Sequence, residues 1–306
     1  MDNIKAVIFD LDGTLLNTEP IEKAGWNHAL ERYGIVIDND EYLTYCGHMG
    51  PDVEIMICEK HGLDIQSGET IIEVGPGKGA LTLPMAENLQ FTIYNLQIIA
   101  IEKDGELIRQ LNKKIKDLEL KNIKVIEGDV LKILPELVSK LKIVNYKLVG
   151  NIPYYITGKL LRTISELKNK PAVSVLMVQK EVAERICATP PKMNLLAAAT
   201  QYWTNPKIIL NLKAKEFDPP PEVDSAVIKL KSKIQNLEPK IAKKYYKLIH
   251  VIFKQPRKTL LNNLKEGTHV PKEELETMIK SLDLPLNCRP QNLTIEKILK
   301  LTKLIN

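Results

Sequence analysis

Two carboxylates near the start of the chain have the spacing of a phosphoryl-transfer site. The stretch VIFDLDGTLLNT, residues 7–18, places Asp10 and Asp12 directly after β-branched and aromatic residues, and Gly13 then turns the backbone. Carboxylates two residues apart at a strand end can point into one crevice. There, one can attack a phosphoryl group while the other handles the leaving-group proton, with Mg²⁺ neutralising the charge.

Three further predicted strands end in residues that suit an adenosine-bearing cofactor. EVGPGKGALT, residues 73–82, brings glycines directly after an apolar run, where a loop can approach a ligand closely. The next strand ends at Glu102, whose carboxylate can accept hydrogen bonds from ribose hydroxyls. The third is followed by Asp129, which is placed to meet an adenine edge. The glycine loop alone also fits a dinucleotide fingerprint.

The stretch NIPYY, residues 151–155, favours chemistry on an adenine amine. This exocyclic amine is a poor nucleophile because its lone pair is delocalised into the ring. The carbonyl of Asn151 and the backbone carbonyl of Ile152 or Pro153 can accept both amine hydrogens, and Pro153 fixes the backbone. Tyr154 can stack on an extruded base. Attack on a sulfonium methyl needs no prior general base, so positioning and electrostatics do most of the work.

The surrounding elements indicate an α/β protein. Short β-rich runs alternate with helical stretches from residue 70, which implies parallel βαβ units in a doubly wound sheet with right-handed crossovers. Helices are predicted over 19–34, 51–61 and 156–167, and from about residue 238 only helical segments punctuated by proline remain. The predicted strands are 70–74, 98–102, 123–127, 146–150, 173–178, 207–212 and 225–230. We predict three parts, residues 1–66, 67–231 and 232–306.

Charge is unevenly distributed along the 306 residues. Residues 1–66 hold 4 Lys and Arg against 13 Asp and Glu, whereas the remaining 240 residues hold 39 against 25. An acidic head joined to a basic body predicts a polyanionic partner, with solvated lysine faces as the alternative. No apolar run reaches the ~18 residues of a membrane span. The four cysteines lack CxxC spacing, which favours a reducing cytoplasm over zinc or disulfides.

Residues from about 67 to 306 resemble the small-subunit ribosomal RNA adenine dimethyltransferases, the 16S dimethyladenosine transferase family. The glycine loop, Glu102, Asp129 and NIPY carry the resemblance. Three more stretches match the family, and the last two of them favour it over antibiotic-resistance relatives that act on large-subunit RNA. They are LMVQKEVAERI (176–186), FDPPPEVDSAV (217–227) and FKQPRKTLLNNL (253–264).

The resemblance implies a Rossmann-like class I methyltransferase sheet with a small all-helical C-terminal domain. It also implies transfer of methyl groups from S-adenosyl-L-methionine to N6 of two adjacent adenosines in small-subunit ribosomal RNA, by a cytoplasmic monomer that docks on the small ribosomal subunit. The cofactor-binding residues we predict are Glu73, Gly75, Gly77, Glu102, Asp129 and Asn151, and the catalytic residues are Asn151, Pro153 and Tyr154.

RNA contact is predicted for four further residues. Lys180 is as well explained by phosphate contact as by ordinary solvation. Arg257 and Lys258 follow a proline in the basic tail, where Phe253 and the Tyr245–Tyr246 pair interleave aromatics with charge. Phe217 precedes a stiff proline-rich loop that could form a wall of the base pocket.

Residues 1 to about 64 resemble the N-terminal part of haloacid-dehalogenase-type phosphohydrolases. That family also needs a later Ser or Thr, a Lys and a second acidic pair, and residues 67–306 contain no Asp-Asp. We therefore predict that Asp10 and Asp12 are vestigial and that no metal is bound. The dimethyltransferase family in turn begins with a Gln-Asn-Phe-Leu type motif over the cofactor's methionine end, which residues 1–66 do not contain.

Three other functions stay open on the sequence. A NAD-type oxidoreductase is disfavoured by NIPY and by the longer spacing from the glycine loop to Glu102. A catalytically impaired RNA-binding factor of ribosome biogenesis would fit the missing motif. A Mg²⁺-dependent phosphohydrolase would act through Asp10 and Asp12.

Overall fold

A computed structural model of the chain describes residues 23, 24, 27, 36–46, 56, 60, 70–89, 97–140, 146–217, 219–233 and 239–305. Contacts divide the chain into two units, Met1–Ser67 with Phe91–Tyr94 and Gly68–Gln90 with Asn95–Asn306. Asp10, Asp12 and their predicted strand lie outside the described residues, as do most residues of the helices predicted over 19–34 and 51–61. The three-part division at 66/67 and 231/232 stays a prediction.

The first unit contains one short described helix, α2 (Asn39–Leu43), which the sequence analysis did not predict. Asp38 caps it by accepting a hydrogen bond from the Glu41 backbone N–H at 2.8 Å. The Tyr45 hydroxyl then donates to the Glu41 carboxylate at 2.6 Å. These local contacts stabilise a helix that is too short to show a hydrophobic period.

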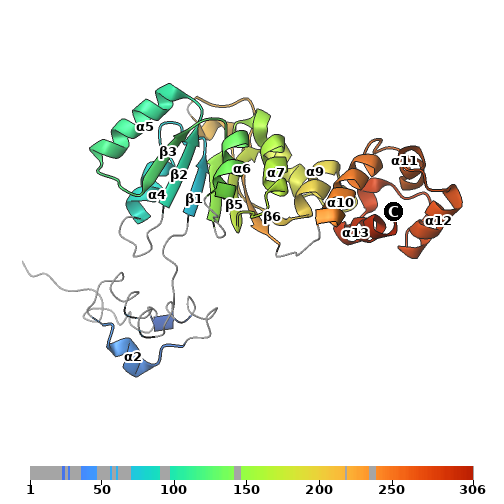
Figure 1. The fold of residues 1–306 in the computed structure, drawn as a ribbon, viewed down its shortest axis with the longest axis horizontal. Coiled ribbons are helices and arrows are strands. Elements are labelled where there is room, and N and C mark those ends of the chain that lie inside the picture. Colours follow the sequence, from blue (N-terminus) through green and yellow to red (C-terminus); the bar gives the residue numbers. More distant parts are fainter. Residues whose placement is uncertain are drawn as a thin grey trace, which may run out of the picture. The chain divides into compact units, whose positions relative to one another are not determined.

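The second unit is built on a seven-stranded sheet with the order β3-β2-β1-β4-β5-β7-β6 (Figure 1). Each of the seven strands predicted from residue 70 onward is present. The strands are β1 (Thr70–Val74), β2 (Gln97–Glu102), β3 (Ile123–Glu127), β4 (Tyr146–Asn151), β5 (Val173–Gln179), β6 (Thr204–Leu212) and β7 (Ser225–Ser232). β1 to β5 run parallel, whereas β7 is antiparallel to both β5 and β6. In the described part of the β6–β7 connection no α-helix crosses the sheet, and paired strands joined without such a crossover run antiparallel.

The helices follow the predicted alternation. Asp104 caps α5 through the N–H groups of Glu106 and Leu107, and Lys114 and Lys116 in the last turn complement the helix dipole. The helix predicted over 156–167 is confirmed as a 3₁₀ turn, η2, followed by α7. In the sheet region the helices are α4 (Thr82–Leu89), α5 (Gly105–Asp117), α6 (Val130–Lys140), η2 (Tyr154–Ile156), α7 (Thr157–Glu166), α8 (Lys180–Ile186), α9 (Leu195–Gln201) and η3 (Ala214–Glu216).

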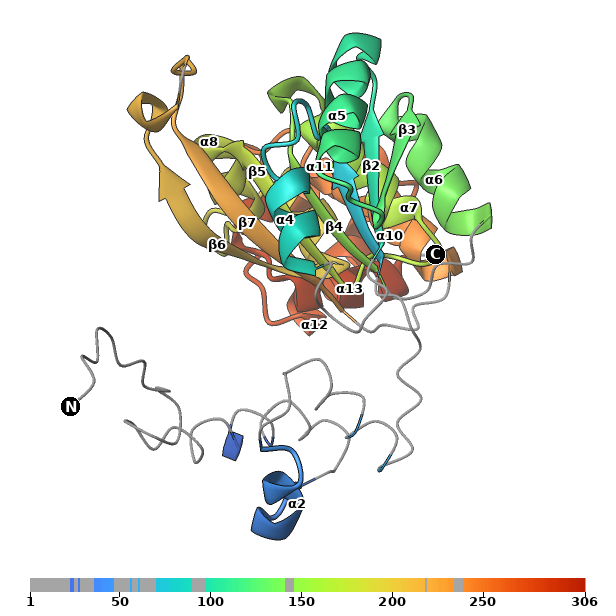
Figure 2. The same cartoon turned by 90° about the vertical axis from the view of Figure 1, so that its left-hand side faces the viewer.

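The two faces of the sheet are covered unequally. β1 and β2 are buried along nearly their whole length, as continuous apolar strands between two helical layers should be. In β5 and β7, by contrast, the paired Leu176 and Ile228 are fully buried, while the paired Val175 and Lys229 on the other face are not. Figure 2 shows α4 and α5 over the β1–β2 half of that second face. Within the described residues, the doubly wound arrangement is therefore complete only over part of the sheet.

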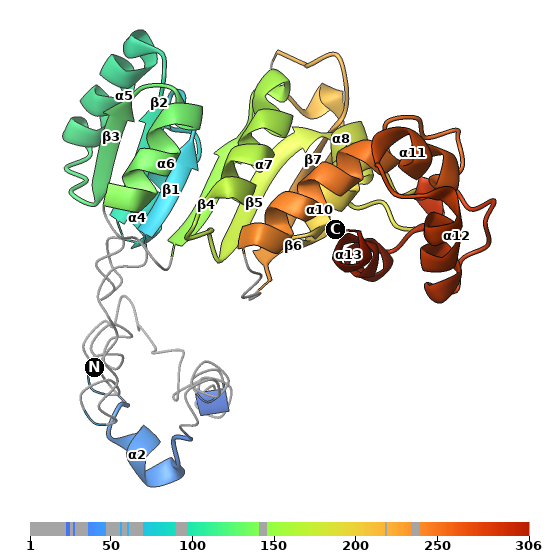
Figure 3. The same ribbon diagram turned by 45° about the vertical axis from the view of Figure 1, so that its right-hand side comes forward.

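The C-terminal tail is helical, as predicted, and packs on the sheet region through tyrosines. The rings of Tyr202 and Tyr245 stack with centroids 4.3 Å apart, and the Tyr245 hydroxyl donates to the Ala198 carbonyl at 2.9 Å. One continuous hydrophobic core runs from the sheet into the tail (Figure 3). The tail consists of α10 (Pro239–Ile252), α11 (Leu260–Gly267), α12 (Lys272–Ser281), η4 (Pro290–Asn292) and α13 (Ile295–Leu304).

Candidate active site

The strand order changes direction between β1 and β4, and open α/β sheets form a crevice at the carboxyl ends of the strands at such a point. β2 and β3 lie to one side of this point and β4 and β5 to the other. Open α/β sheets bind ligands at such a reversal. The glycine loop and NIPYY leave the sheet at this point, and a Cβ built on Gly75 would lie 3.8 Å from the backbone oxygen of Asn151. Two motifs that are 76 positions apart in sequence are thus neighbours here.

The glycine loop adopts a backbone that other residues rarely adopt. Gly75 and Gly77 have φ of +66° and +57°, and Gly79 has φ of +86°. A Cβ on Gly77 would meet no atom within 4 Å, so the loop borders open space there. A Cβ on Gly79 would come within 2.7 Å of a Leu111 methyl carbon. Gly77 therefore leaves room beside the loop, and Gly79 allows close helix packing.

Glu102 is held by three backbone N–H groups. Gly77 donates to Oε2 at 3.1 Å, while Lys103 and Asp104 donate to Oε1 at 2.7 and 3.0 Å. A carboxylate offers about four lone-pair sites, so acceptor capacity remains for a ligand hydroxyl. The N–H of Gly128 also donates to the backbone oxygen of Glu102, at 2.7 Å. These contacts join the ends of β1, β2 and β3.

Asp129 caps the helix that follows β3. Its Oδ1 accepts a hydrogen bond from the Leu131 N–H at 2.9 Å, and its backbone oxygen accepts from Lys132 and Ile133. One carboxylate oxygen is thereby committed to the first turn of α6. The structure places Asp129 beside the Glu102 end of β2, and its contact with an adenine edge stays a prediction.

Glu73 is buried rather than displayed in the crevice. Its side chain is 2% exposed, and the Thr82 hydroxyl donates to its Oε2 at 2.6 Å. Burial raises the pKa of Glu73 to about 7, the Thr82 hydrogen bond opposes this rise, and the charge of Glu102 adds to it. The Glu73–Thr82 contact joins the two ends of the glycine loop, a role the sequence analysis did not foresee.

The two tyrosines of NIPYY differ in their surroundings, because Tyr154 is hydrogen-bonded and half-buried whereas Tyr155 is exposed. Asn151 and Pro153 are exposed at the end of β4. Tyr154 is half-buried, and its hydroxyl forms a 2.9 Å hydrogen bond with the hydroxyl of Ser225. Tyr155 is 82% exposed. Ser225 lies in the FDPPPEVDSAV stretch that carried the resemblance, but no local pattern there points to Tyr154.

Residues 57–306 match the family model for ribosomal RNA adenine dimethylases. The chain belongs to this family. Residues 7–63 match the model for haloacid dehalogenase-like hydrolases, so both predicted resemblances are confirmed. The two matched ranges overlap at residues 57–63, just before β1.

Curated relatives of this dimethylase chain are small-subunit enzymes by name. A ribosomal RNA small subunit methyltransferase A from Dehalococcoides mccartyi strain CBDB1 is 37% identical over 239 residues, covering 78% of this chain and 79% of the relative. One from Mycoplasma capricolum is 34% identical over 247 residues, covering 79% and 89%.

Solved structures of other methyltransferases have the same fold. A dimethyladenosine transferase from Plasmodium falciparum aligns with a TM-score of 0.60 at 24% identity, covering 81% of this chain and 94% of that one. The 23S rRNA methyltransferase ErmE aligns with a TM-score of 0.62 at 20% identity, covering 82% and 97%. These likenesses confirm the predicted class I sheet with a helical C-terminal part. None of the helices in the described ranges has the length and hydropathy needed to cross a bilayer.

Two of the residues predicted to contact RNA lie near the Tyr154 end of the site. The Lys180 N–H donates to the Asp224 backbone oxygen at 3.0 Å, and Asp224 Oδ1 accepts from the Ala214 N–H at 3.0 Å. Phe217 is half-buried directly after η3. Lys180 also borders a shallow hollow that contains three carboxylates. The hollow is lined by Gln179, Lys180, Glu181, Glu184, Val223 and Asp224.

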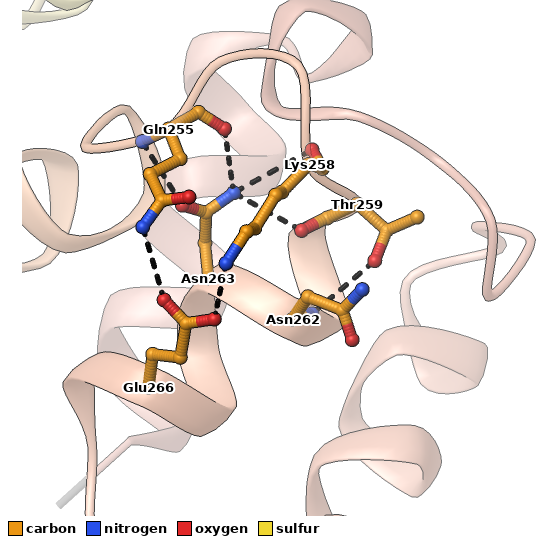
Figure 4. A network of polar contacts seen from close by, with 6 residues as sticks. All are labelled: Gln255, Lys258, Thr259, Asn262, Asn263 and Glu266. Atoms are coloured by element: carbon orange, nitrogen blue, oxygen red, sulfur yellow. Dashed lines mark hydrogen bonds and ion pairs between the residues drawn. The ribbon is translucent and has the colours of Figure 1, made fainter.

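The other two lie at the start of α11, in the helical tail. Asn263 is buried, donates to the Gln255 backbone oxygen and accepts from its N–H, both at 3.1 Å (Figure 4). Lys258 forms a 2.5 Å ion pair with Glu266, whereas Arg257 is exposed. The structure does not bring this pair to the strand-end crevice.

The aromatics that supported RNA contact in the tail belong to the core instead. Tyr245 is fully buried and Phe253 nearly so, and the Tyr246 hydroxyl donates to a backbone oxygen of α9 at 3.3 Å. Their alternation with lysines is the amphipathic pattern of α10, whose apolar side faces the protein. The interleaving of these aromatics with charge therefore gives no support for RNA contact, which stays a prediction for Arg257 and Lys258.

Proposed function

We propose that this chain transfers methyl groups from S-adenosyl-L-methionine to N6 of adenine in ribosomal RNA. Its membership of the adenine dimethylase family supports the reaction and the class of substrate. The closeness of Gly75 to Asn151 is the observation that carries the proposal, because it puts a cofactor loop beside a target-amine motif in one crevice.

The residues at the strand ends fit an adenosine-bearing cofactor. The open space beside Gly77 admits a ligand against the backbone, and Glu102 has acceptor capacity for ribose hydroxyls. Asp129 has a carboxylate oxygen beyond the one that caps α6. When bound, S-adenosyl-L-methionine would supply an electrophilic methyl group.

The NIPYY residues would prepare the other reactant. The side-chain oxygen of Asn151 and a backbone carbonyl of Ile152 or Pro153 accept the hydrogens of the adenine amine, which localises its lone pair on nitrogen. Tyr154 stacks on the base and sets its plane. This positioning and electrostatic complementarity lower the barrier without a general base.

The finer substrate is two adjacent adenosines of small-subunit ribosomal RNA. The curated relatives are named for the small subunit, which supports this choice. A monomer suffices, because every residue assigned to cofactor and base comes from one chain. The proposed setting is ribosome biogenesis in the cytoplasm, with the basic tail facing the RNA of the small subunit.

The decisive experiment incubates the full chain with radiolabelled S-adenosyl-L-methionine and undermethylated small ribosomal subunits. Label is expected in N6,N6-dimethyladenosine, and Asn151→Ala should lower the rate by at least about 100-fold. Asn205→Ala, an exposed asparagine on β6, is the matched control and should not change the rate. An unchanged rate in Asn151→Ala would refute its role. Cofactor binding without any label would favour the impaired RNA-binding factor.

A further inference from the structure

A side-chain hydrogen bond joins the start of β7 to NIPYY, the motif that we assign to the target amine. The hydroxyls of Tyr154 and Ser225 lie 2.9 Å apart, although 71 positions separate the two residues. Ser225 is fully buried and Tyr154 half-buried, whereas the adjacent Tyr155 is 82% exposed. Of the two tyrosines in the motif, Tyr154 is the one whose hydroxyl is hydrogen-bonded to a residue of the sheet.

Ser225 itself sits on a rigid support. In β7 it pairs with Gln179 of β5 and with Leu212 of β6, so strands flank it on both sides. Asp224, just before it, accepts the Lys180 N–H through its backbone and the Ala214 N–H through its side chain. A hydroxyl held by strand pairing and packing is more sharply placed than one on a loop.

The hydrogen bond to Ser225 fixes the hydroxyl end of the Tyr154 ring. At the other end of the side chain, the backbone of Tyr154 is set by the 3₁₀ turn in which the Ile156 N–H donates to the Pro153 oxygen at 3.0 Å. With only its backbone held, the ring could rotate about its side-chain torsions. With the hydroxyl held as well, the long axis of the ring, from Cβ to the hydroxyl oxygen, is fixed by β4 and β7 together.

We propose that Ser225 is a positioning residue for methyl transfer, which fixes the place and long axis of the Tyr154 ring against which the target adenine stacks. This inference rests on the proposed function. Stacking transmits the orientation of the ring to the base, and the base orientation decides how N6 approaches the methyl group. Misalignment of reacting atoms by about 1 Å can cost about 100-fold in rate.

The test compares Ser225→Ala, Tyr154→Phe and the double variant in the labelled-subunit assay. Each single change removes the same hydrogen bond but keeps the aromatic ring at position 154. Each should therefore lower kcat about fivefold to tenfold with little change in KM. The double variant should be no slower than the singles, because the two side chains act as one unit. Ser232→Ala, which removes a hydroxyl bonded to the Pro171 oxygen at the other end of β7, is the matched control. It should leave kcat unchanged.

A second readout follows the base without turnover. A hairpin RNA with 2-aminopurine at the target position should lose fluorescence on binding wild type, through stacking on Tyr154, and lose less on binding Ser225→Ala. The inference is overturned if Ser225→Ala keeps the wild-type kcat, if the two single effects add in the double variant, or if Ser232→Ala is equally slow. Failure of wild type to label RNA would instead refute the proposed function, and the inference with it.

Discussion

Glu73 carries a buried carboxyl whose protonation should be visible in the stability of the protein. Its pKa is raised from 4.5 to about 7, first by burial and then by the charge of Glu102. The folded state therefore holds a proton on Glu73 between pH 4.5 and pH 7 that the unfolded state has released. Stability from this group is present below pH 4.5 and is lost as the pH rises to 7.

Glu73→Gln should remove this pH dependence. Because glutamine stays neutral, the unfolding free energy of the variant relative to wild type should rise by about 2 to 3 kcal/mol from pH 5 to pH 8. Urea denaturation at the two pH values measures the difference. Glu136→Gln, which changes an exposed carboxylate on α6, is the control and should show no such rise. A constant difference for Glu73→Gln would mean that the carboxyl titrates normally.

At the scale of elements, the glycine loop couples the cofactor crevice to helix packing. Gly79 combines a φ of +86° with a Cβ position only 2.7 Å from Leu111 of α5 and 2.9 Å from Leu83 of α4. Leu111 is fully buried, so it cannot move away at low cost. The loop therefore keeps its shape only if this position lacks a side chain.

Gly79→Ala should destabilise the fold by about 2 to 4 kcal/mol, through backbone strain and overpacking together. It should also weaken binding of S-adenosyl-L-methionine, since Gly75 and Gly77 belong to the same turn. Chemical denaturation and calorimetric titration measure the two effects. Gly158→Ala in α7 is the control for stability: its Cβ meets nothing within 4 Å and its φ is not positive, so it should be neutral or slightly stabilising. Equal effects at the two positions would refute this account.

At the scale of the whole molecule, the chain joins parts of two enzyme families. The hydrolase match spans residues 7–63 and the dimethylase match residues 57–306. The charge changes sign between them, from −9 over residues 1–66 to +14 over the rest. Only the second match extends over the residues that we assign to a reaction.

The double variant Asp10→Asn with Asp12→Asn should therefore transfer methyl groups as fast as wild type, within about twofold, because neither carboxylate is among the residues that we assign to methyl transfer. The two carboxylates also lack the partners that phosphoryl transfer needs. Wild type should show no Mg²⁺-dependent hydrolysis of a phosphomonoester such as p-nitrophenyl phosphate. Methyl-transfer and phosphatase assays on the full chain check both statements. Hydrolysis that disappears in the double variant would revive the phosphohydrolase.

Much of the fold follows from local patterns in the sequence. The β-branched runs predicted all seven strands of the described sheet, because apolar strands leave a dense and regular signature. The order of glycine loop, Glu102, Asp129 and NIPYY also predicted one shared crevice, because the ends of parallel strands meet at one edge of a sheet. The helical segments punctuated by proline from about residue 238 likewise predicted the helical tail.

Other features depend on contacts between distant residues, and these only the tertiary structure decided. Insertion of β7 between β5 and β6 depends on packing and strand pairing, which no local period encodes. The same holds for the burial of Tyr245, whose ring stacks on that of Tyr202. The sequence by itself determined which groups could do chemistry and in what order they meet the sheet edge. The structure decided that Glu73 is buried and that Ser225 is hydrogen-bonded to Tyr154, because a hydrogen bond across 71 positions exists only after the strands have paired.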